Sequence, residues 1–527
     1  MMQPLIAFVA LLALLPTSIA LAQAPGVPRP RQSPAAAAAT PSPEKPVPAA
    51  PSVAVDDRFV ATSHVTTING TELRYTATTG TLVLRHPNGK ARGHIFFVAY
   101  TREGQEVSAR PITFSYNGGP GSPAIWLHMG LMGPKRVKLA AEGFQPGPPY
   151  ELVTNNESPL DVTDIVMIDP VQTGFSRAAE GEDSKQFTGV TGDIESVADF
   201  IRLYLTKFKR WPSPKFLLGE SYGTMRSAGL SEALQARHGI ELNGIVLVSS
   251  ILDYLSKGYA PGHDLPFANF LPSFTAIAWY HKKLPADLQA LDQRKAIDES
   301  RSFAFGEYLT QMAKGNRLQA AERLALAQKV ARYSGLSADF IMKANLRVTD
   351  PRFRKELLRE RGVTIGRLDA RYTGLDADDA GEFQEYDPSN DALAGPYTAL
   401  FSNYVRDELK WETDLPYYTS GRVQPWDYAP YNNRYLNLLN ELRTAMAHNP
   451  YLKVMVANGY YDMATPFAAT EHTFAHLGYK ETYKDRVTLK YYEAGHMMYI
   501  HPEMLKLLKK DIADFINGAK TNRKLPA

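Results

Sequence analysis

A serine between two glycines stands near the middle of the chain, in the segment Gly219-Glu220-Ser221-Tyr222-Gly223. Glycines on both sides of a serine allow a strand to turn sharply into a helix, which presents the serine hydroxyl as a nucleophile. The alternative is an ordinary serine at the start of a helix. The apolar run "KFLLG" precedes the segment and the helix-like "TMRSAGLSEALQARHG" follows it. This strand, turn and helix order predicts that Ser221 is a nucleophile.

A serine nucleophile needs a histidine to accept its proton and an acid to orient that histidine. Two late loops supply these groups. "KVMVANGYYD" places Asp462 just after a strand, and "LKYYEAGH" places His496 after the next strand. When a nucleophilic serine sits on such a turn, the acid and then the histidine follow it along the chain. We therefore expect Ser221, Asp462 and His496 to form a catalytic triad.

The chain offers other candidates for both partners. His472 and His476 lie on a predicted helix and His501 precedes a proline, so all three are better explained as surface or packing histidines. Asp169 could compete as the acid, but it precedes the serine in sequence and ends a middle strand. Asp462 is therefore preferred.

An acyl-transfer site also needs backbone N–H donors for the negative oxygen that develops during the reaction. The segment "SYNGGPGSP", residues 115–123, follows a predicted strand, and its glycines allow the backbone to approach a ligand closely. The second donor would be the amide of Tyr222, next to the nucleophile. Taken alone, a Gly/Pro cluster is typical of an ordinary turn.

Short, continuously apolar runs predict the elements that position these residues. Each run is followed by Gly or Asp and then by a helix-like stretch, which is typical of buried parallel strands joined by helical crossovers. An alternating pattern over residues 71–104, with turn signals "PNGK" and "REGQ", predicts an antiparallel meander at the leading edge. The chain therefore predicts an α/β fold with a mostly parallel sheet. The runs end at Tyr116, Asp169, Gly219, Ser250 and Ala457, and "VTLKYYEAGH" adds a later strand.

A helical insertion is predicted over about residues 255–431, where Leu, Ala, Lys and Arg recur at helical spacing without comparable strand runs. An aromatic segment, "WETDLPYYTSGRVQPWDYAPYNNRY", lies at the end of this region. It either lines a pocket or covers the insertion.

The first residues predict a signal peptide over 1–22, with an apolar stretch from Leu5 to Leu15 and then the small-residue pattern Ala20-Leu21-Ala22. An uncleaved anchor is the alternative. Residues 23–56 are rich in Pro and Ala, which predicts an extended tether because so few large apolar side chains cannot offset the ordering entropy. The chain has no cysteine, and an exported protein without cysteine is typical of a bacterial periplasmic or secreted enzyme.

Charge and motifs exclude several classes of partner. Lys and Arg total 58 against 55 Asp and Glu, so the net charge of +3 does not indicate binding to nucleic acid or to a membrane surface. After cleavage of the signal peptide we expect no stable membrane insertion. Neither "H-E-x-x-H" nor a P-loop pattern is present, so no metal or organic cofactor is implied.

Four segments together resemble the serine carboxypeptidases, the S10 peptidases of the α/β-hydrolase fold: "NGGPG", "DPVQTGFS", "GESYG" and the "NGYYD…AGHM" pair. They occur in family order from about Asn117 to Met497. The resemblance implies a peptidase domain over residues 57–522 that releases C-terminal residues from peptides, with a homodimer as a possible assembly.

The resemblance also implies a role for each matching residue. Ser221 would be the nucleophile, His496 the general base and Asp462 its orienting acid. The amides of Gly119 and Tyr222 would form the oxyanion hole. Asn117 and Glu220 would bind the substrate's C-terminal carboxylate. Because a carboxylate beside an ionised Glu220 would be repelled, the pKa of Glu220 must be raised in the complex, which predicts activity favoured at acidic pH.

Two positions depart from the family pattern. Ser115 stands where the family has a tryptophan, and Leu131 stands where the family has a glutamate that supports carboxylate binding. Hydrolysis is thus better supported than release of C-terminal residues. An esterase or an acyltransferase using the same triad is the first alternative, and a non-catalytic binding protein is the second.

Overall fold

The computed structural model of the protein describes residues 56–478 and 481–521. The predicted signal peptide, residues 1–22, and residues 23–55 of the predicted tether lie outside the described residues. Every residue proposed for catalysis or substrate binding lies within them.

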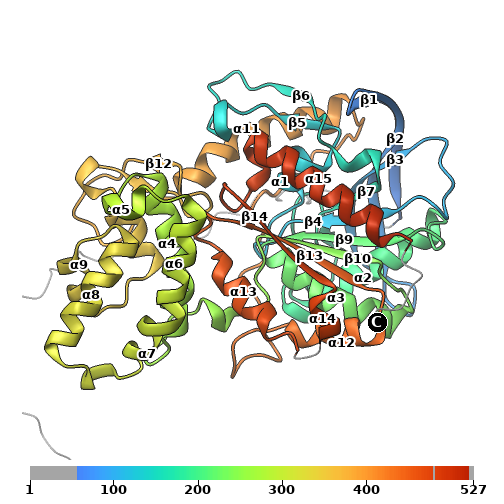
Figure 1. The fold of residues 1–527 in the computed structure, drawn as a ribbon. Coiled ribbons are helices and arrows are strands. Elements are labelled where there is room, and N and C mark those ends of the chain that lie inside the picture. The colour runs from blue at the N-terminus through green and yellow to red at the C-terminus, as the bar shows by residue number, and fades with distance from the viewer. Residues whose placement is uncertain (1–55, 479–480, 522–527) are drawn as a thin grey trace, which may run out of the picture. The chain divides into compact units, whose positions relative to one another are not determined.

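One sheet of ten strands runs through the described part of the chain (Figure 1). Its first three strands and their junction with β7 are antiparallel, and all further neighbours from β7 to β14 are parallel. This confirms the predicted α/β class. In spatial order the strands are β1 (Arg58–Ile68), β2 (Thr71–Arg85), β3 (Ala91–Arg102), β7 (Asp164–Ile168), β4 (Ile112–Tyr116), β9 (Lys215–Glu220), β10 (Gly244–Val248), β13 (Lys453–Gly459) and β14 (Val487–Tyr492), and β8 (Arg177–Ala178) pairs with β3.

Tight turns set the register of the antiparallel edge. Asn69 and Gly70 connect β1 to β2, and both have a positive φ, 50° and 73°. Asn-Gly is the pair that a two-residue hairpin turn with two positive φ angles favours. The loop between β2 and β3 contains Gly89 at φ 85°, where the sequence "PNGK" predicts a turn.

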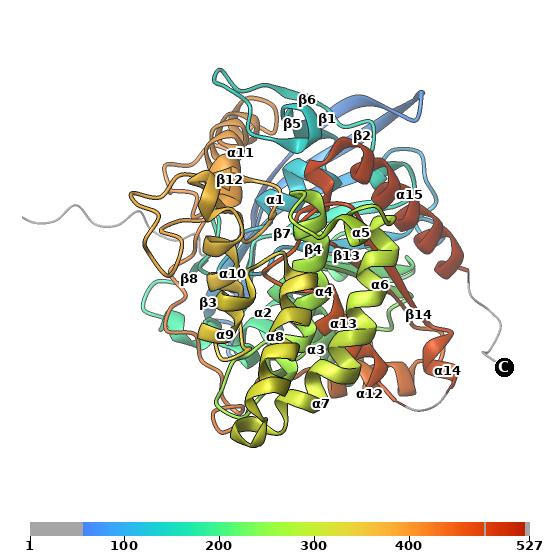
Figure 2. The same cartoon turned by 60° about the vertical axis from the view of Figure 1, so that its left-hand side comes forward.

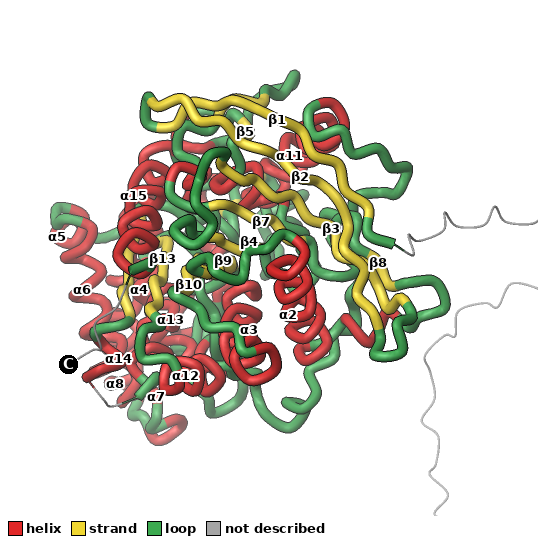
Figure 3. Tube along the Cα trace, turned by 90° about the vertical axis from the view of Figure 1, so that its right-hand side faces the viewer, coloured by secondary structure: helices red, strands yellow, loops and turns green. Residues whose placement is uncertain are grey.

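Helices cover both faces of the sheet (Figure 3). Neighbouring residues of a strand point alternately to the two faces. Phe97 and Leu217 pack against the helices of one face, and Phe96 and Leu218 against those of the other. All four side chains are almost completely buried. Because the sheet is covered on both faces, these strands carry apolar residues at neighbouring positions instead of alternating apolar with polar residues. The first face carries α2 (Val190–Lys207), α3 (Tyr222–His238) and α12 (Leu439–His448), and the second carries α1 (Ile125–Leu127), α11 (Pro388–Asp407) and α15 (Pro502–Ala519).

A helical region with its own apolar core stands between β10 and β13 in the chain (Figure 2). Within it the rings of Phe274 and Phe353 stack at a centroid distance of 3.9 Å. The core also includes Phe467 of α13 (Phe467–Ala475), so this region packs against the loop side of β13. Its elements are α4 (Leu265–Tyr280), α5 (Ala286–Gln289), α6 (Gln293–Phe303), α7 (Leu309–Met312), α8 (Ala320–Ser334), α9 (Ala338–Lys343), α10 (Asp350–Glu356), β11 (Thr364–Ile365) and β12 (Thr373–Gly374).

The connection from β4 to β7 differs from the expected helical crossover. It contains the three-residue α1, a short π-helical turn over His128–Met132, and the hairpin of β5 (Lys135–Val137) and β6 (Leu152–Thr154). Prolines at positions 120, 123 and 134 prevent a long helix there. Elsewhere α14 (Glu481–Lys484) precedes β14. Across residues 56–478 and 481–521, no helix combines the length and apolar character needed to cross a membrane.

Candidate active site

Ser221 lies on the sharp turn between β9 and α3, at the carboxyl end of the parallel strands. Its φ of 59° and ψ of −127° lie outside the regions that non-glycine residues ordinarily occupy. Its side chain makes no capping hydrogen bond to α3, and its backbone N–H donates to the carbonyl of Val248 at 3.0 Å. Ser221 thus occupies the N-cap position of α3 in a strained conformation without capping the helix through its side chain, and its hydroxyl is left for other chemistry.

Glycines allow this turn and the neighbouring loop to pack backbone against backbone. A Cβ atom at Gly219 would lie 2.2 Å from the carbonyl oxygen of Gly223. A Cβ at Gly118 would lie 2.4 Å from the amide nitrogen of Tyr222. Gly119 adopts φ 101°, which a side chain disfavours. The Gly-rich loop after β4 thus lies directly against the start of α3, beside Ser221.

His496 and Asp462 form a buried pair on the loops after β14 and β13. The Nδ1 of His496 lies 2.7 Å from Oδ2 of Asp462. Burial alone would raise the pKa of Asp462, but the positive charge of His496 and hydrogen bonds from His496 and Thr465 hold that pKa below its usual value. Because the carboxylate is ionised and can only accept, Nδ1–H donates to it and Nε2 is left to act as a base.

Thr465 was not anticipated from the sequence, although it stands only three residues after Asp462. Its hydroxyl donates to Oδ2 of Asp462 at 2.6 Å and lies 3.3 Å from Nδ1 of His496. The other carboxylate oxygen accepts from the backbone N–H groups of Ala464 and Thr465, at 2.7 and 2.9 Å. These bonds fix the orientation of the carboxylate toward the imidazole.

The rival candidates lie elsewhere. Asp169 accepts from the backbone N–H of Ala124 at 2.8 Å and supports the start of α1 rather than an imidazole. The rings of His472 and His476 pack on each other at 4.3 Å on the last turn of α13. The ring of His501 accepts from the backbone N–H of Glu503 at the start of α15.

Ser221 and His496 line the same pocket, which has a volume of about 180 Å³. The Gly-rich loop, the helical region and α11 all contribute to its lining. The pocket therefore brings together the Gly-rich loop, the turn at Ser221 and the loop of His496, whereas Asp462 reaches it only through its bond to His496. The described residues that line it are Asn117, Gly118, Gly119, Ser122, Trp126, Glu220, Ser221, Arg367, Leu368, Asn390, Leu393, His496 and Met497.

Asn117 and Glu220 form a buried polar pair in this pocket. The amide Nδ2 of Asn117 donates to Oε1 of Glu220 at 2.8 Å, and its Oδ1 accepts from the backbone N–H of Leu127 at 3.0 Å. Burial raises the pKa of Glu220 to about 7. Oε2 of Glu220 is buried and has no well-aligned hydrogen bond within the described residues, and the hydroxyl of Tyr499 is its neighbour, which acts to lower the pKa of Glu220.

The two positions that depart from the family pattern provide no carboxylate-binding group. Leu131 is fully buried in the apolar cluster that includes α15. Ser115 is also fully buried, and its hydroxyl has no hydrogen-bond partner among the described residues. Any carboxylate bound in the pocket therefore depends on Asn117, Glu220 and groups outside the family pattern.

The helical region contributes directly to the site, which the sequence did not indicate. The backbone N–H of His496 donates to the carbonyl of Leu368 at 2.6 Å, and that of Met463 donates to the carbonyl of Arg367 at 3.1 Å. One loop of the region, between β11 and β12, thus holds both the loop of Asp462 and the loop of His496. Arg367 and Leu368 also line the pocket.

The aromatic segment 411–435 covers the turn and the Gly-rich loop. The rings of Trp426 and Tyr222 meet edge to face at 5.4 Å, and the backbone N–H of Gly421 donates to the carbonyl of Gly121 at 2.6 Å. The described residues that line the pocket of Ser221 include none from this segment. The segment therefore does not line this pocket, and these contacts are with the Gly-rich loop and α3 rather than with the helical insertion that it was expected to cover.

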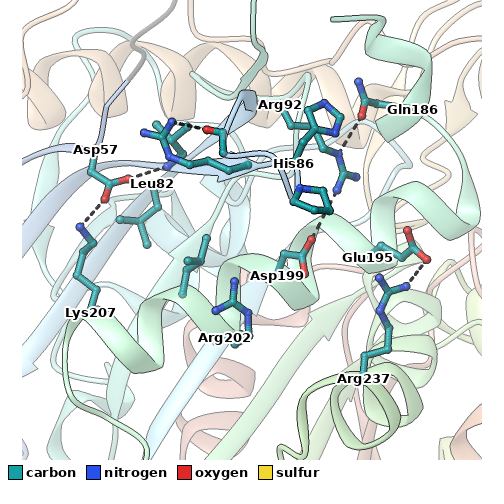
Figure 4. A pocket seen from close by; sticks show the side chains of 15 residues that line it. Asp57, Leu82, His86, Arg92, Gln186, Glu195, Asp199, Arg202, Lys207 and Arg237 are labelled. Carbon is teal, nitrogen blue, oxygen red and sulfur yellow. Dashed lines mark hydrogen bonds and ion pairs between the residues drawn. The ribbon is translucent and has the colours of Figure 1, made fainter.

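A larger pocket of about 940 Å³ lies away from Ser221, between the β2–β3 hairpin and the helices α2 and α3 (Figure 4). Its charged side chains pair with one another: Lys207 with Asp57, and Arg237 with Glu195. It contains no residue of the proposed triad. This pocket is therefore a surface feature and not part of the candidate active site.

Comparison with solved structures gives distant likenesses, each with a TM-score below 0.4. A monoacylglycerol lipase from Paleococcus ferrophilus is 12% identical with a TM-score of 0.32, and the alignment covers 81% of this chain and 99% of that one. A carboxyl esterase from Bacillus coagulans is 13% identical with a TM-score of 0.35, covering 84% and 99%. A monoglyceride lipase from Saccharomyces cerevisiae is 10% identical with a TM-score of 0.34, covering 82% and 93%.

No curated protein gives a significant match to the chain. The family model for serine carboxypeptidase matches residues 79–499, which include every strand of the parallel part of the sheet, the turn at Ser221 and both loops of the His496–Asp462 pair. With its mostly parallel sheet and its helical region, the chain has the α/β-hydrolase fold and belongs to the serine carboxypeptidase family.

Proposed function

We propose that the protein is a serine-type carboxypeptidase that releases the C-terminal residue of peptides through an acyl-enzyme. One observation carries the proposal. The pocket that contains Ser221 and His496 also contains the buried Asn117–Glu220 pair, so a nucleophile and a carboxylate-binding group stand within one small cavity. An endopeptidase has no use for such a group, whereas an enzyme that recognises a free C-terminus requires one.

In the first half of the reaction, Oγ of Ser221 attacks the carbonyl carbon of the last peptide bond while Nε2 of His496 takes its proton. Asp462 stabilises the imidazolium that results. The amides of Gly119 and Tyr222 donate to the oxyanion of the tetrahedral intermediate. His496 then gives its proton to the leaving nitrogen, the C–N bond breaks, and the C-terminal amino acid departs.

In the second half, water attacks the acyl-enzyme ester and His496 takes a proton from that water. The second tetrahedral intermediate collapses, the bond to Ser221 Oγ breaks, and the proton on His496 returns to the serine. The shortened peptide leaves with a new C-terminal carboxylate. The free enzyme is thereby regenerated.

Recognition of the free C-terminus depends on the protonation of Glu220. The pKa of Glu220, raised to about 7 by burial, keeps this side chain neutral below pH 7. A neutral Glu220 donates a hydrogen bond to the substrate carboxylate, and the Asn117 amide adds a second donor. Above pH 7 the ionised side chain repels the carboxylate. We therefore expect peptide hydrolysis to be favoured at acidic pH.

An esterase or acyltransferase is the second candidate, and the absence of a carboxylate-supporting group at Ser115 and Leu131 is the observation that favours it. Peptide and ester turnover by the wild type and the Ser221→Ala variant discriminate the two functions. A carboxypeptidase hydrolyses N-blocked dipeptides with a free C-terminus. An esterase hydrolyses only the uncharged esters, with the same dependence on Ser221.

We further propose that the enzyme acts on peptides in the periplasm or outside the cell. The apolar stretch and small-residue pattern of residues 1–22 support export. Cell fractionation of the full chain tests this placement. Activity confined to the cytoplasmic fraction with residues 1–22 still attached would contradict it.

A further inference from the structure

Arg367 is a cation without a counter-ion in the pocket of Ser221. Among the described residues that line this pocket, it alone is an arginine or lysine. Its side chain is exposed, and its guanidinium makes no hydrogen bond or ion pair to a described residue. Its backbone, in contrast, is fixed: the N–H donates to Oδ1 of Asp387 at 2.9 Å and the carbonyl accepts from Met463. The chain therefore holds the base of this side chain at the pocket and leaves its charged end free.

Asp387, the acid bonded to the backbone of Arg367, makes no ion pair with the guanidinium. Asp387 uses Oδ1 to accept from the backbone of Arg367 and from the backbone and hydroxyl of Ser389, and Oδ2 to accept from the backbone of Leu368. These bonds fix the loop without bringing the carboxylate onto the guanidinium. Lys257 is a cationic neighbour: burial, and then the charge of Arg367, lowers the pKa of Lys257 to about 8, against the opposing charges of Asp350 and Asp462. An anion brought into the pocket would meet a guanidinium that makes no direct ion pair within the described residues.

The pocket has room for one small residue. Its volume of about 180 Å³ corresponds to roughly six water molecules at about 30 Å³ each. At its buried end lie Asn117 and Glu220, which are 1% and 3% exposed. Arg367 and Asn390 lie at its exposed end. If the main-chain carboxylate of the leaving residue occupies the buried end, the side chain of that residue lies in another part of the pocket. At the exposed end such a side chain would meet the positive charge of Arg367.

We propose that Arg367 pairs with a side-chain carboxylate of the leaving residue, so that the enzyme prefers peptides ending in Asp or Glu. The inference rests on the proposed function, because it assigns the main-chain carboxylate to Asn117 and Glu220. A planar guanidinium suits a carboxylate because it donates two parallel hydrogen bonds. Arg367 is thus a specificity-determining residue supplied by the helical region and absent from the four family segments.

The test compares N-blocked dipeptides that share a penultimate residue and end in Glu, Gln or Leu. At pH 6 a C-terminal Glu side chain is ionised and Glu220 is protonated. The wild type should cleave the Glu peptide with a kcat/KM roughly two- to fivefold above that for the Gln peptide, as expected for one ion pair at an exposed side chain. Arg367→Gln should remove this preference by raising KM for the Glu peptide. Arg367→Lys should retain part of the preference.

The matched control is Arg317→Gln, an exposed arginine of the same helical region that does not line the pocket. This variant should leave kcat/KM for the Glu, Gln and Leu peptides unchanged. If Arg367→Gln lowers kcat/KM by the same factor for the Glu, Gln and Leu peptides, the inference is overturned, because the guanidinium would then bind the main-chain carboxylate. An unchanged Glu-to-Gln ratio would overturn it as well. A wild type that cleaves none of the three peptides refutes the proposed function itself, whereas one that cleaves all three equally refutes only the role of Arg367.

Discussion

The backbone N–H of His496 donates a hydrogen bond to the carbonyl oxygen of Leu368 at 2.6 Å, so the helical region directly fixes the loop of the proposed general base. The neighbouring Gly495 N–H donates to Oδ2 of Asp369 at 3.2 Å. Asp369 is itself held by a buried ion pair with Arg371. The region therefore does more than cover the site, because the position of the imidazole depends on it.

Gly495→Ala should disrupt this contact. A Cβ at position 495 would lie 2.4 Å from the carbonyl oxygen of Leu368 and 2.5 Å from Cα of Asp369, and neither backbone atom can move without shifting the loop. We expect a loss of about 1–3 kcal/mol in the free energy of unfolding, as for other overpacked sites. We also expect a drop in kcat that exceeds any change in KM, because the imidazole moves relative to Ser221.

Gly518→Ala is the matched control, since a Cβ there meets no atom within 4 Å and the residue lies exposed in α15. It should raise the free energy of unfolding by roughly 0.5–1 kcal/mol and leave kcat unchanged. Thermal unfolding and steady-state kinetics on both variants check the pair. If Gly495→Ala has the same kcat as the wild type, the position of the His496 loop does not depend on its contact with Leu368.

Asp462→Asn should abolish most of the activity while the fold is retained. The amide oxygen would keep the bonds from the backbone N–H groups of Ala464 and Thr465, so the amide nitrogen would face His496 and donate to Nδ1. His496 would then adopt the tautomer whose Nε2 carries the proton. We expect kcat to fall by roughly 10³- to 10⁴-fold with KM little changed. Single-turnover kinetics and reaction with a fluorophosphonate probe measure the loss. A variant that retains more than a tenth of wild-type kcat would contradict the assignment of Asp462.

Thr465→Val should reduce kcat by roughly tenfold, because it removes the hydroxyl that donates to Oδ2 of Asp462 at 2.6 Å while it preserves the volume of the side chain. Thr465→Ser should restore most of the activity. If the Thr465 side chain had only a structural role, both variants would be less stable and Thr465→Ser would not recover kcat. Equal kcat values in the Val and Ser variants would therefore refute a positioning role for the hydroxyl.

Glu220→Gln should change the pH profile rather than simply abolish activity. In the wild type the pKa of Glu220, raised to about 7, makes peptide hydrolysis fall as the pH increases through 7, because the carboxyl loses its proton and repels the substrate carboxylate. Gln stays neutral at every pH, so the rise in KM above pH 7 should disappear in the variant. Uncharged ester substrates serve as the control and should lack this rise in both proteins. A rise that persists in Glu220→Gln would place its origin in another group.

The fold and the core of the site follow from local sequence patterns. Uninterrupted apolar runs predict β4, β7, β9, β10 and β13 because strands buried on both faces need no polar alternation. The turn at Ser221 has a direct signature, since Gly219 is required where a Cβ would lie 2.2 Å from a backbone oxygen. Asp462 and His496 are predicted as the partners of Ser221 because each follows a late strand.

Residues whose role depends on long-range packing could not be predicted in this way. Leu368 and Arg367 reach the site through the path of the helical region, and nothing in their immediate sequence marks a contact with the loop of His496. The helical crossover expected after β4 is absent because prolines interrupt that connection. Thr465 is the exception, since a hydroxyl three residues after an aspartate is a local pattern that can hydrogen-bond to it.

The proposed function depends most directly on whether Ser221 releases C-terminal residues from peptides with a free carboxylate. The measurement follows the release of amino acids from N-blocked dipeptides, as free acids and as C-terminal amides, by the wild type and Ser221→Ala between pH 4 and pH 8. We predict release by the wild type alone, with a preference for the free acid that weakens above pH 7. No release from either form, together with Ser221-dependent hydrolysis of simple esters, would contradict a carboxypeptidase.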